Sequence, residues 1–589
     1  MKKALSFLLC LCLTVGCLAG CNTQPPVETT APTTPSTTEP TTQPVTEPPK
    51  EVKQPPKRET PLTREVNYED PNWYKDAMII DIDGDWPAIY LMDDMASKDR
   101  MVARAKDYFS NLAGTNVTDV TICAFEQISY VPSETMEWIH EKAAKIVAES
   151  GAAALANYDH ASGRYPALYE ALTKYELDWY QTAVDCAAEA GIRPWLYLRM
   201  NDLHYTNDYN SPYHEDFWYE ALENGWLIGE GYGAGAGSNQ RIENLYNFAH
   251  EEVRTWLLTY IEEMLMKYDV FGLQLDFMRN IYCFDYLDEE PGYEEIMTQF
   301  VRDVDALLQQ AEAHHGHDMK LMIRLGRSIE HNLVYGFDVE AWVQEDLVDA
   351  LVPSPEGYID SGIPVDQWKA LVGEEVAVFP GFENWMMGNG KPTIEQIKGY
   401  GASFYAMGAD GLYFNNYYQL GSMGPEVWGY YDGLMSWGTR TYIVSDQDIT
   451  PIGEQQYHPM PLALHEAPET GMDYEIQLGP VREDEYVYVV VGYNTSFKTE
   501  FVAEVTLNGM KPVKSDTYKP TKGDIRGYVN TGASIGFAPV AGRNIYYAFT
   551  GLSLEEGEPL VIHFTQNPGD KCNVEYLEVT VQTYEQIFW

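Results

Sequence analysis

The chain has 589 residues, 45% hydrophobic and 13% aromatic, which is typical of folded domains. A chain of this length is expected to form about two or three domains rather than one core. The formal net charge of −50 excludes nucleic acid as a partner, because phosphates require a basic surface, and argues against electrostatic adhesion to anionic lipid.

Residues 1–21 have the pattern of a bacterial secretory signal. Two lysines precede an apolar stretch from Ala4 to Leu18, which is too short to span a membrane. The stretch runs into Leu-Ala-Gly and Cys21, which resembles the lipobox of bacterial lipoproteins. The resemblance implies cleavage before Cys21, lipidation of its thiol and an extracytoplasmic protein anchored at the cell membrane or cell surface. A plain secretory signal is the alternative.

Residues 22–65 are rich in Thr, Pro, Glu and Gln, with almost no large apolar side chain. Such a segment buries too little surface to offset the entropy lost on ordering. It is therefore predicted to be a disordered tether between the anchor and the folded part.

Residues 66–445 alternate short apolar runs with amphipathic stretches, the pattern of parallel strands joined by helices. Eight runs predict a (β/α)8 barrel with long insertions, of the α/β class. A doubly wound sheet is the alternative, which the glycine run Gly229–Gly237 does not support because it follows no strand. The runs are Ala77–Asp81, Val117–Phe125, Pro194–Arg199, Val270–Asp276, Lys320–Leu325, Val348–Pro353, Glu375–Phe379 and Gly411–Phe414.

Three stretches between these runs have clear helical signals. Apolar residues at helical spacing from Ile296 to Leu308 form one face of a helix. A second helix is predicted over Glu251–Lys267, and Thr393 begins a third.

Residues 446–589 lose the helical period and show alternating, half-buried strands instead. Turn signals between the strands predict an antiparallel β-sandwich. Such a domain either binds sugar or shields the barrel, and the structural role is favoured slightly. The predicted strands are Tyr474–Leu478, Tyr486–Tyr493, Phe501–Leu507, Asn544–Phe549, Leu560–Phe564 and Val574–Val581.

The residues that follow the eight barrel strands are expected to meet at one mouth, where barrel enzymes carry their active sites. Carboxylates and amides there would bind hydroxyl groups, and aromatic faces would stack on sugar rings, so a carbohydrate substrate is predicted. The predicted substrate-binding residues are Asp83, Trp86, Arg199, Asn201, Asp202, His204, Arg279, Arg324, Tyr358, Trp385 and Asn415.

Cleavage of a glycosidic bond needs one protonated and one ionised carboxyl group. Asp276, at the end of the fourth run, is predicted to be the ionised partner, with Arg279 near enough to lower its pKa. A structural salt bridge between Asp276 and Arg279 is the alternative. Glu383 after the seventh run and Glu356 after the sixth compete for the role of acid, with a surface carboxylate as the alternative for each.

Arginines are concentrated near this mouth although the chain is acidic: Arg199, Arg279, Arg324 and Arg327. They either neutralise the carboxylates of the mouth or bind an anionic group on the substrate, such as a uronate or a sulfate.

No metal or cofactor is predicted. His204 and His214 lie in a loop with Asp202, but their spacing matches no standard ligand motif, so a structural or sugar-binding histidine is favoured. The cysteines beyond the lipidation site stand at unrelated spacings and are predicted to be buried free thiols, with at most one bridged pair. They are Cys123, Cys186, Cys283 and Cys572.

Three segments resemble the bacterial glycosyl-hydrolase-like (β/α)8 barrel lipoproteins grouped near glycoside hydrolase family 10: LRMNDLH at 198–204, GLQLDFMR at 272–279 and WVQEDLVD at 342–349. The resemblance covers roughly residues 75–420 and implies that Asp276 belongs to an active site. Family 10 xylanases use glutamates at strands 4 and 7. Because strand 4 ends on an aspartate here, xylanase activity is not implied.

These observations favour a surface-anchored glycoside hydrolase that acts on an oligo- or polysaccharide. The competing hypothesis is a non-catalytic glycan-binding lipoprotein that kept the barrel. A second carboxyl group within about 10 Å of Asp276 would favour the hydrolase, because both hydrolytic geometries require one.

Overall fold

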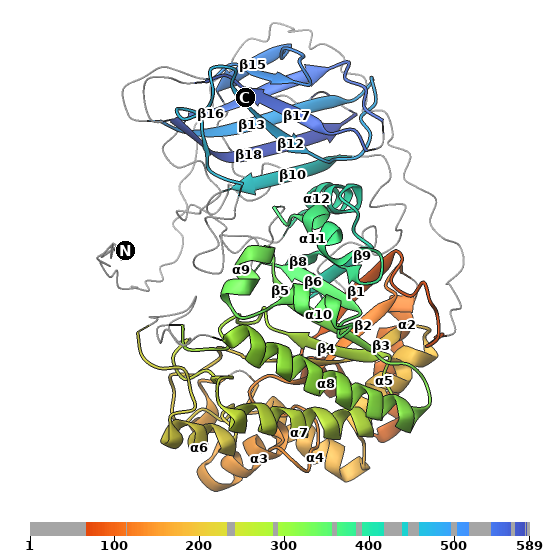
Figure 1. The fold of residues 1–589 in the computed structure, drawn as a ribbon. Helices are drawn as coiled ribbons and strands as arrows, with labels where there is room; N and C mark the ends of the chain where they lie inside the picture. The colour runs from red at the N-terminus through yellow and green to blue at the C-terminus, as the bar shows by residue number, and fades with distance from the viewer. Residues whose placement is uncertain are drawn as a thin grey trace, which may run out of the picture. The chain divides into compact units, whose positions relative to one another are not determined.

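A computed structural model describes most of the chain beyond residue 65 (Figure 1). The described residues are 66–113, 115–158, 160–231, 242–286, 292–355, 362–383, 392–417, 439–445, 459–495, 503–517, 543–555, 557–566, 572–583 and 585. The predicted signal, Cys21 and the linker lie outside them. No described helix is both long and apolar enough to cross a membrane.

The α/β part contains a sheet of nine labelled strands, and every pairing in it is parallel. Its order, β7-β6-β5-β4-β3-β2-β1-β9-β8, follows the chain, whereas a doubly wound sheet reverses direction. The strands are β1 Ala77–Ile82, β2 Asp119–Phe125, β3 Arg193–Arg199, β4 Gly272–Asp276, β5 Lys320–Gly326, β6 Ala350–Ser354, β7 Ala377–Val378, β8 Gly381–Glu383 and β9 Gly411–Asn415. The fourth strand therefore ends on Asp276, as predicted.

The two ends of this sheet meet, because β7 and β8 are halves of one barrel strand. The Phe379 N–H donates to Leu351 on β6, while on the other side the N–H groups of Asp410 and Tyr413 donate to Val378 and to the residue after Phe379. That residue is a proline, which lacks an N–H and so interrupts the ladder between the halves. The predicted (β/α)8 barrel is thereby confirmed.

Helices connect the strands and cover the outside of the barrel (Figure 1). α7 has the bounds predicted for it, and α8 contains the predicted apolar face. α12 begins with a capping box in which Thr393 and Gln396 bond to each other's backbone N–H groups. The helices are α1 Trp86–Tyr90, α2 Lys98–Ala113, α3 Ile139–Ser150, α4 Arg164–Tyr175, α5 Trp179–Glu189, α6 Asp216–Asn224, α7 Glu251–Lys267, α8 Tyr293–His315, α9 Ile329–Val334, α10 Val339–Gln344, α11 Val365–Val372 and α12 Ile394–Ala406, with 3-10 turns at Leu91–Asp94 and Ala152–Leu155.

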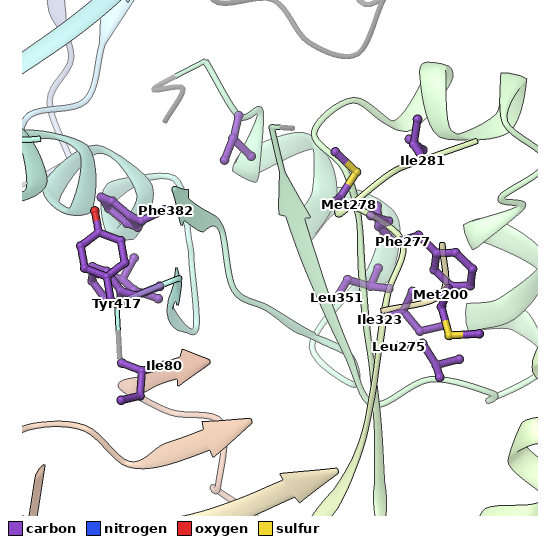
Figure 2. Packing of buried hydrophobic residues seen from close by; sticks show 14 of the residues in the cluster. Ile80, Met200, Leu275, Phe277, Met278, Ile281, Ile323, Leu351, Phe382 and Tyr417 are labelled. Atoms are coloured by element: carbon purple, nitrogen blue, oxygen red, sulfur yellow. The ribbon is translucent and has the colours of Figure 1, made fainter. Parts of the chain in front are cut away.

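Alternation along the strands separates two apolar cores. Side chains such as Leu275, Ile323 and Leu351 belong to the larger cluster that packs outside the barrel (Figure 2). The intervening positions fill the interior, where Trp195 and Met322 belong to a second, smaller cluster. Because successive side chains of a strand point to opposite faces, Asp276 next to Leu275 points inward.

The C-terminal region consists of antiparallel sheets, as predicted. One has the order β10-β18-β13-β16-β15, with β11 also on β18, and the other the order β12-β17-β14. The strands are β10 Arg440–Ser445, β11 Leu462–Ala463, β12 Met472–Ile476, β13 Tyr486–Thr495, β14 Val505–Leu507, β15 Lys514–Thr517, β16 Arg543–Thr550, β17 Leu560–Phe564 and β18 Cys572–Gln582. The domain division at residue 446 stays a prediction, although β10 already pairs with β18.

Stability below neutral pH is expected to depend on His140 of α3. Its ring is fully buried against Tyr130, Trp138 and Tyr165, with both ring nitrogens unpartnered among the described residues, and burial lowers its pKa to about 3. Because the folded state then binds fewer protons than the unfolded state, the stability that neutral His140 contributes is complete above about pH 6.5 and falls below it.

The expected loss between pH 6.5 and 4.5 is up to about 3 kcal/mol, or about 1.4 kcal/mol per pH unit. Urea unfolding at both pH values measures it. His140→Phe should lose less free energy of unfolding than the wild-type protein over this pH interval. The control is His314→Gln, which replaces an exposed histidine of α8. Equal losses in the wild-type protein and His140→Phe would contradict this account.

Candidate functional site

Three charged side chains stand side by side at the carboxyl ends of neighbouring strands. Arg199 ends β3 opposite Asp276 of β4, and Asp276 stands opposite Arg324 of β5. All three are buried. The strand register therefore places a carboxylate between two guanidinium groups inside the barrel.

The Asp276 carboxylate accepts hydrogen bonds from three donors. Its Oδ2 lies 2.8 Å from the Tyr197 hydroxyl and 2.8 Å from Arg324 Nη1, and its Oδ1 lies 2.7 Å from the Met278 N–H. Both oxygens of Asp276 therefore act as hydrogen-bond acceptors. The predicted pairing with Arg279 is wrong, because Arg279 lies in the loop beyond β4 and pairs with Asp202 instead.

Glu383, at the end of β8, is held by the same arginine. Arg324 donates through Nη2 to Glu383 Oε1 and through Nη1 to Asp276, and its Nε lies 3.2 Å from Ser354 Oγ. The Asn415 amide donates to Glu383 Oε2 at 2.8 Å. Two carboxyl groups thus share the terminal nitrogens of one guanidinium, which keeps them closer than the roughly 10 Å limit for hydrolytic pairs.

A second unit of the same kind surrounds Arg199. Its Nη2 lies 2.9 Å from Asp83, and its Nη1 lies 2.5 Å from Glu126. Its Nε donates at 3.0 Å to the Tyr197 hydroxyl, which itself donates to Asp276. One continuous hydrogen-bond network therefore joins both arginine units across the mouth.

The carboxyl groups of this network and the buried Asp81 of β1 differ in their pKa values. Burial raises the pKa of Asp81 to about 7, and it raises those of Glu126 and Glu383 above the usual value. Burial acts on Asp83 as well, but Arg199 outweighs it and holds the pKa of that carboxyl below its usual value. Carboxyl groups with different pKa values at one site are what acid and base catalysis require.

The outer edge of the mouth is formed by Asp202, His204 and Arg279. Asp202 is fully buried, with Oδ1 2.5 Å from His204 Nδ1 and Oδ2 3.3 Å from Arg279 Nε. Burial opposes its ionisation, yet His204 and the two neighbouring arginines hold its pKa well below the usual value. The other histidine of this loop, His214, is buried and stacks on Trp218, so the two histidines do not form one site.

Glu126, Asp202 and His204 place potential ligand atoms within 4.8 Å of one another. Guanidinium nitrogens already contact these atoms: Arg199 Nη1 lies beside Glu126, and Arg279 Nη2 lies 3.1 Å from His204 Nε2. A metal ion would be repelled by both arginines, so this set of donors fits a cation poorly. The four cysteines that the structure describes are buried free thiols, as predicted.

Several predicted binding residues do not reach the mouth or lie outside the described residues. Trp86 is fully buried and packs against Tyr108 of α2, so it belongs to the core rather than to a sugar platform. The Asn201 amide donates to the carbonyl oxygens of Tyr246 and Tyr282 and accepts from the Tyr246 N–H. Glu356, Tyr358 and Trp385 lie outside the described residues.

Three side chains of the network were not among the predicted site residues: Tyr197, Glu126 and Ser354. Tyr197 precedes Arg199 by two residues on β3, and alternation along that strand would have placed both inside the barrel. Glu126 follows β2 directly. Because the register of β2 shifts near its end, counting alternate residues along the strand does not predict which way the Glu126 side chain points.

The sequence matches no family model and no curated protein. Structural comparison finds a cycloisomaltooligosaccharide glucanotransferase from Paenibacillus (12% identity, 86% of this chain and 58% of that chain, TM-score 0.34). It also finds the PgaB glycoside hydrolase domain from Bordetella bronchiseptica (12% identity, 58% of this chain and 93% of that chain, TM-score 0.35). A third match is a GH36 α-galactosidase from Geobacillus stearothermophilus (9% identity, 85% of this chain and 57% of that chain, TM-score 0.34).

The chain thus spans just over half the length of the glucanotransferase and of the α-galactosidase. These likenesses are too slight to bear on activity. Membership of the lipoprotein family near glycoside hydrolase family 10 stays a prediction.

Proposed function

We propose that the barrel hydrolyses glycosidic bonds at this mouth. The observation that carries the proposal is the pair Asp276 and Glu383, which share the two terminal nitrogens of Arg324 at the carboxyl ends of their strands. Paired carboxyl groups are the chemical requirement of this reaction, and the carboxyl end of a barrel is where such groups act.

In the proposed mechanism, Glu383 is the acid and Asp276 the ionised carboxylate. The Glu383 proton passes to the glycosidic oxygen as the bond between that oxygen and the anomeric carbon breaks, and the electron pair stays on the oxygen. Asp276 either bonds to the anomeric carbon as the glycosidic bond breaks, or takes a proton from a water molecule whose oxygen bonds to that carbon instead. In the first case a second step follows, in which Glu383 takes a proton from water, the water oxygen bonds to the anomeric carbon and the bond to Asp276 breaks. Glu356 remains the alternative acid.

A non-catalytic glycan-binding protein is the competing function. It would need no second carboxyl group near Asp276 and no difference in pKa among the carboxyl groups. The proximity of Glu383 and the raised pKa values of Glu383 and Glu126, both caused by burial, therefore favour hydrolysis.

A screen of the wild-type protein against oligo- and polysaccharides tests this function through the release of reducing ends. The panel should include neutral, uronic-acid and sulfated glycans in both anomeric configurations. Hydrolysis of at least one class is expected. Binding of glycans without hydrolysis across the panel would favour the competing function.

We also propose that Cys21 is lipidated and holds the protein on the outer side of the membrane. The support is the lipobox-like sequence before Cys21 and the Thr/Pro-rich segment after it. Expressed in a bacterium with the lipoprotein pathway, the wild-type protein should sediment with membranes. Cys21→Ser should appear in the soluble extracytoplasmic fraction, and an unchanged membrane fraction would reject the anchor.

A further inference from the structure

The arginines of the mouth differ in how many of their donors are already used. An arginine offers five N–H donors in a rigid fork. Arg199 and Arg324 are each engaged through all three nitrogens, and their side chains are only 2% and 1% exposed. Every nitrogen of both guanidinium groups is therefore already paired with an oxygen of the protein.

Arg279 is different, because its side chain is 27% exposed. Its Nε lies 3.3 Å from Asp202, and its Nη2 lies 3.1 Å from His204 Nε2. These two contacts use one edge of the fork. The other edge, formed by Nη1 and the second N–H of Nη2, has no partner among the described residues and offers two parallel donors.

Asp202 and His204 hold Arg279 in this orientation. Arginine only donates, so His204 Nε2 must accept from Arg279, and the hydrogen-bond pattern assigns the ring proton to Nδ1, which faces Asp202. Asp202, fully buried, therefore orients both groups while the His204 side chain remains 32% exposed. An arginine fixed in advance loses less entropy when it binds a ligand.

We propose that the open edge of Arg279 binds the anionic group of an acidic sugar, either a uronate carboxylate or a sulfate ester. The proposal rests on the proposed function, since it places an acidic glycan at the same mouth. Of the four arginines predicted near the mouth, it assigns the contact with the anionic group to Arg279. Two other carboxylates that act on Arg279, Glu126 and Asp83, are both paired with Arg199.

Calorimetric titration with uronic-acid oligosaccharides and with their methyl esters tests the proposal, because the ligands of each pair differ mainly in charge. The wild-type protein should bind the acid at least about tenfold more tightly than the ester. Arg279→Gln should lose that preference while binding the ester within about twofold of the wild-type protein.

The matched control is Arg302→Gln, which changes the net charge equally on the outer helix α8, where Arg302 pairs with Glu295 and Glu345. It should keep the preference for the acid. Sulfated oligosaccharides and their desulfated counterparts form a second arm, and the arm that shows the larger Arg279-dependent preference identifies the anionic group. Thermal unfolding of each variant verifies that it folds.

Equal affinity for charged and uncharged ligands in both arms would overturn the proposal. A charge preference that survives Arg279→Gln would overturn it as well. Binding that depends on Arg279 without any hydrolysis would support this inference but count against the proposed function. Hydrolysis of neutral glycans without a charge preference would support the proposed function but overturn this inference.

Discussion

Asp276→Asn is expected to lower kcat at least about 100-fold on any glycoside that the wild-type protein cleaves. The substitution removes the negative charge that the mechanism requires. It also turns an amide N–H₂ toward one of the donors that Asp276 accepts from, Tyr197, Arg324 or Met278. Initial rates at saturating substrate measure the effect, and thermal unfolding verifies that the variant remains folded.

Asp303→Asn on the outer helix α8 is the matched control, because this aspartate contacts only Gln299 in the hydrogen bonds described. Its kcat should stay within about twofold of the wild-type value, since surface substitutions are usually small in effect. A folded Asp276→Asn variant with wild-type kcat would remove Asp276 from the mechanism.

Glu383→Gln and Glu356→Gln decide between the two acids. Removing the acid should lower kcat severely for substrates with poor leaving groups. It should lower kcat only slightly for substrates whose leaving groups depart without protonation. A variant whose loss is the same for both kinds of substrate has not lost the acid.

Arg324→Met is expected to lower the free energy of unfolding by about 3–5 kcal/mol at pH 7, because it leaves Asp276 and Glu383 buried without their cation. Removal of the positive charge also raises the pKa of Glu383 further. Stability held by the protonated carboxyl group is complete below about pH 4.3 and is lost as the pH rises through the pKa of the folded state. The destabilisation should therefore be larger at pH 7.5 than at pH 5.

Urea unfolding of the wild-type protein and the variant at both pH values measures this loss. Arg302→Met breaks exposed ion pairs on α8 and should cost no more than about 1 kcal/mol. Adding Glu383→Gln to Arg324→Met should recover part of the loss. Equal costs for Arg324→Met and Arg302→Met would show that the buried pairing contributes little.

The barrel was predictable because its strands are short apolar runs separated by helical periods. The same pattern placed Asp276 at the end of the fourth strand, and the structure agrees. Alternation along a strand and the position of its end are local properties, so the residues beside them in the sequence reveal both.

The partners of Asp276 were not predictable in the same way. Arg279 is close in sequence, yet the cation that binds Asp276 is Arg324, 48 residues away on the next strand. Which residues face each other across a parallel sheet depends on the register of the strands. One sequence contains no signal for the register between strands that are separated by tens of residues. The same reason hid the contact between Tyr197 and Asp276.

The position of Trp86 shows a different limit of sequence inference. An aromatic residue just past a strand suits a sugar platform, but the chain turns into α1 at this point and directs the ring against Tyr108 and Phe109 of α2. Burial of a large apolar surface stabilises the fold, and here it decided the direction of the side chain.

The most direct test of Asp276 as the ionised partner is the turnover of Asp276→Ala with and without sodium azide. Azide is a nucleophile that needs no base, so it can replace either a carboxylate nucleophile or base-activated water. Asp276→Ala should be nearly inactive alone, regain turnover with azide and release a glycosyl azide. Wild-type turnover by Asp276→Ala without azide would contradict it.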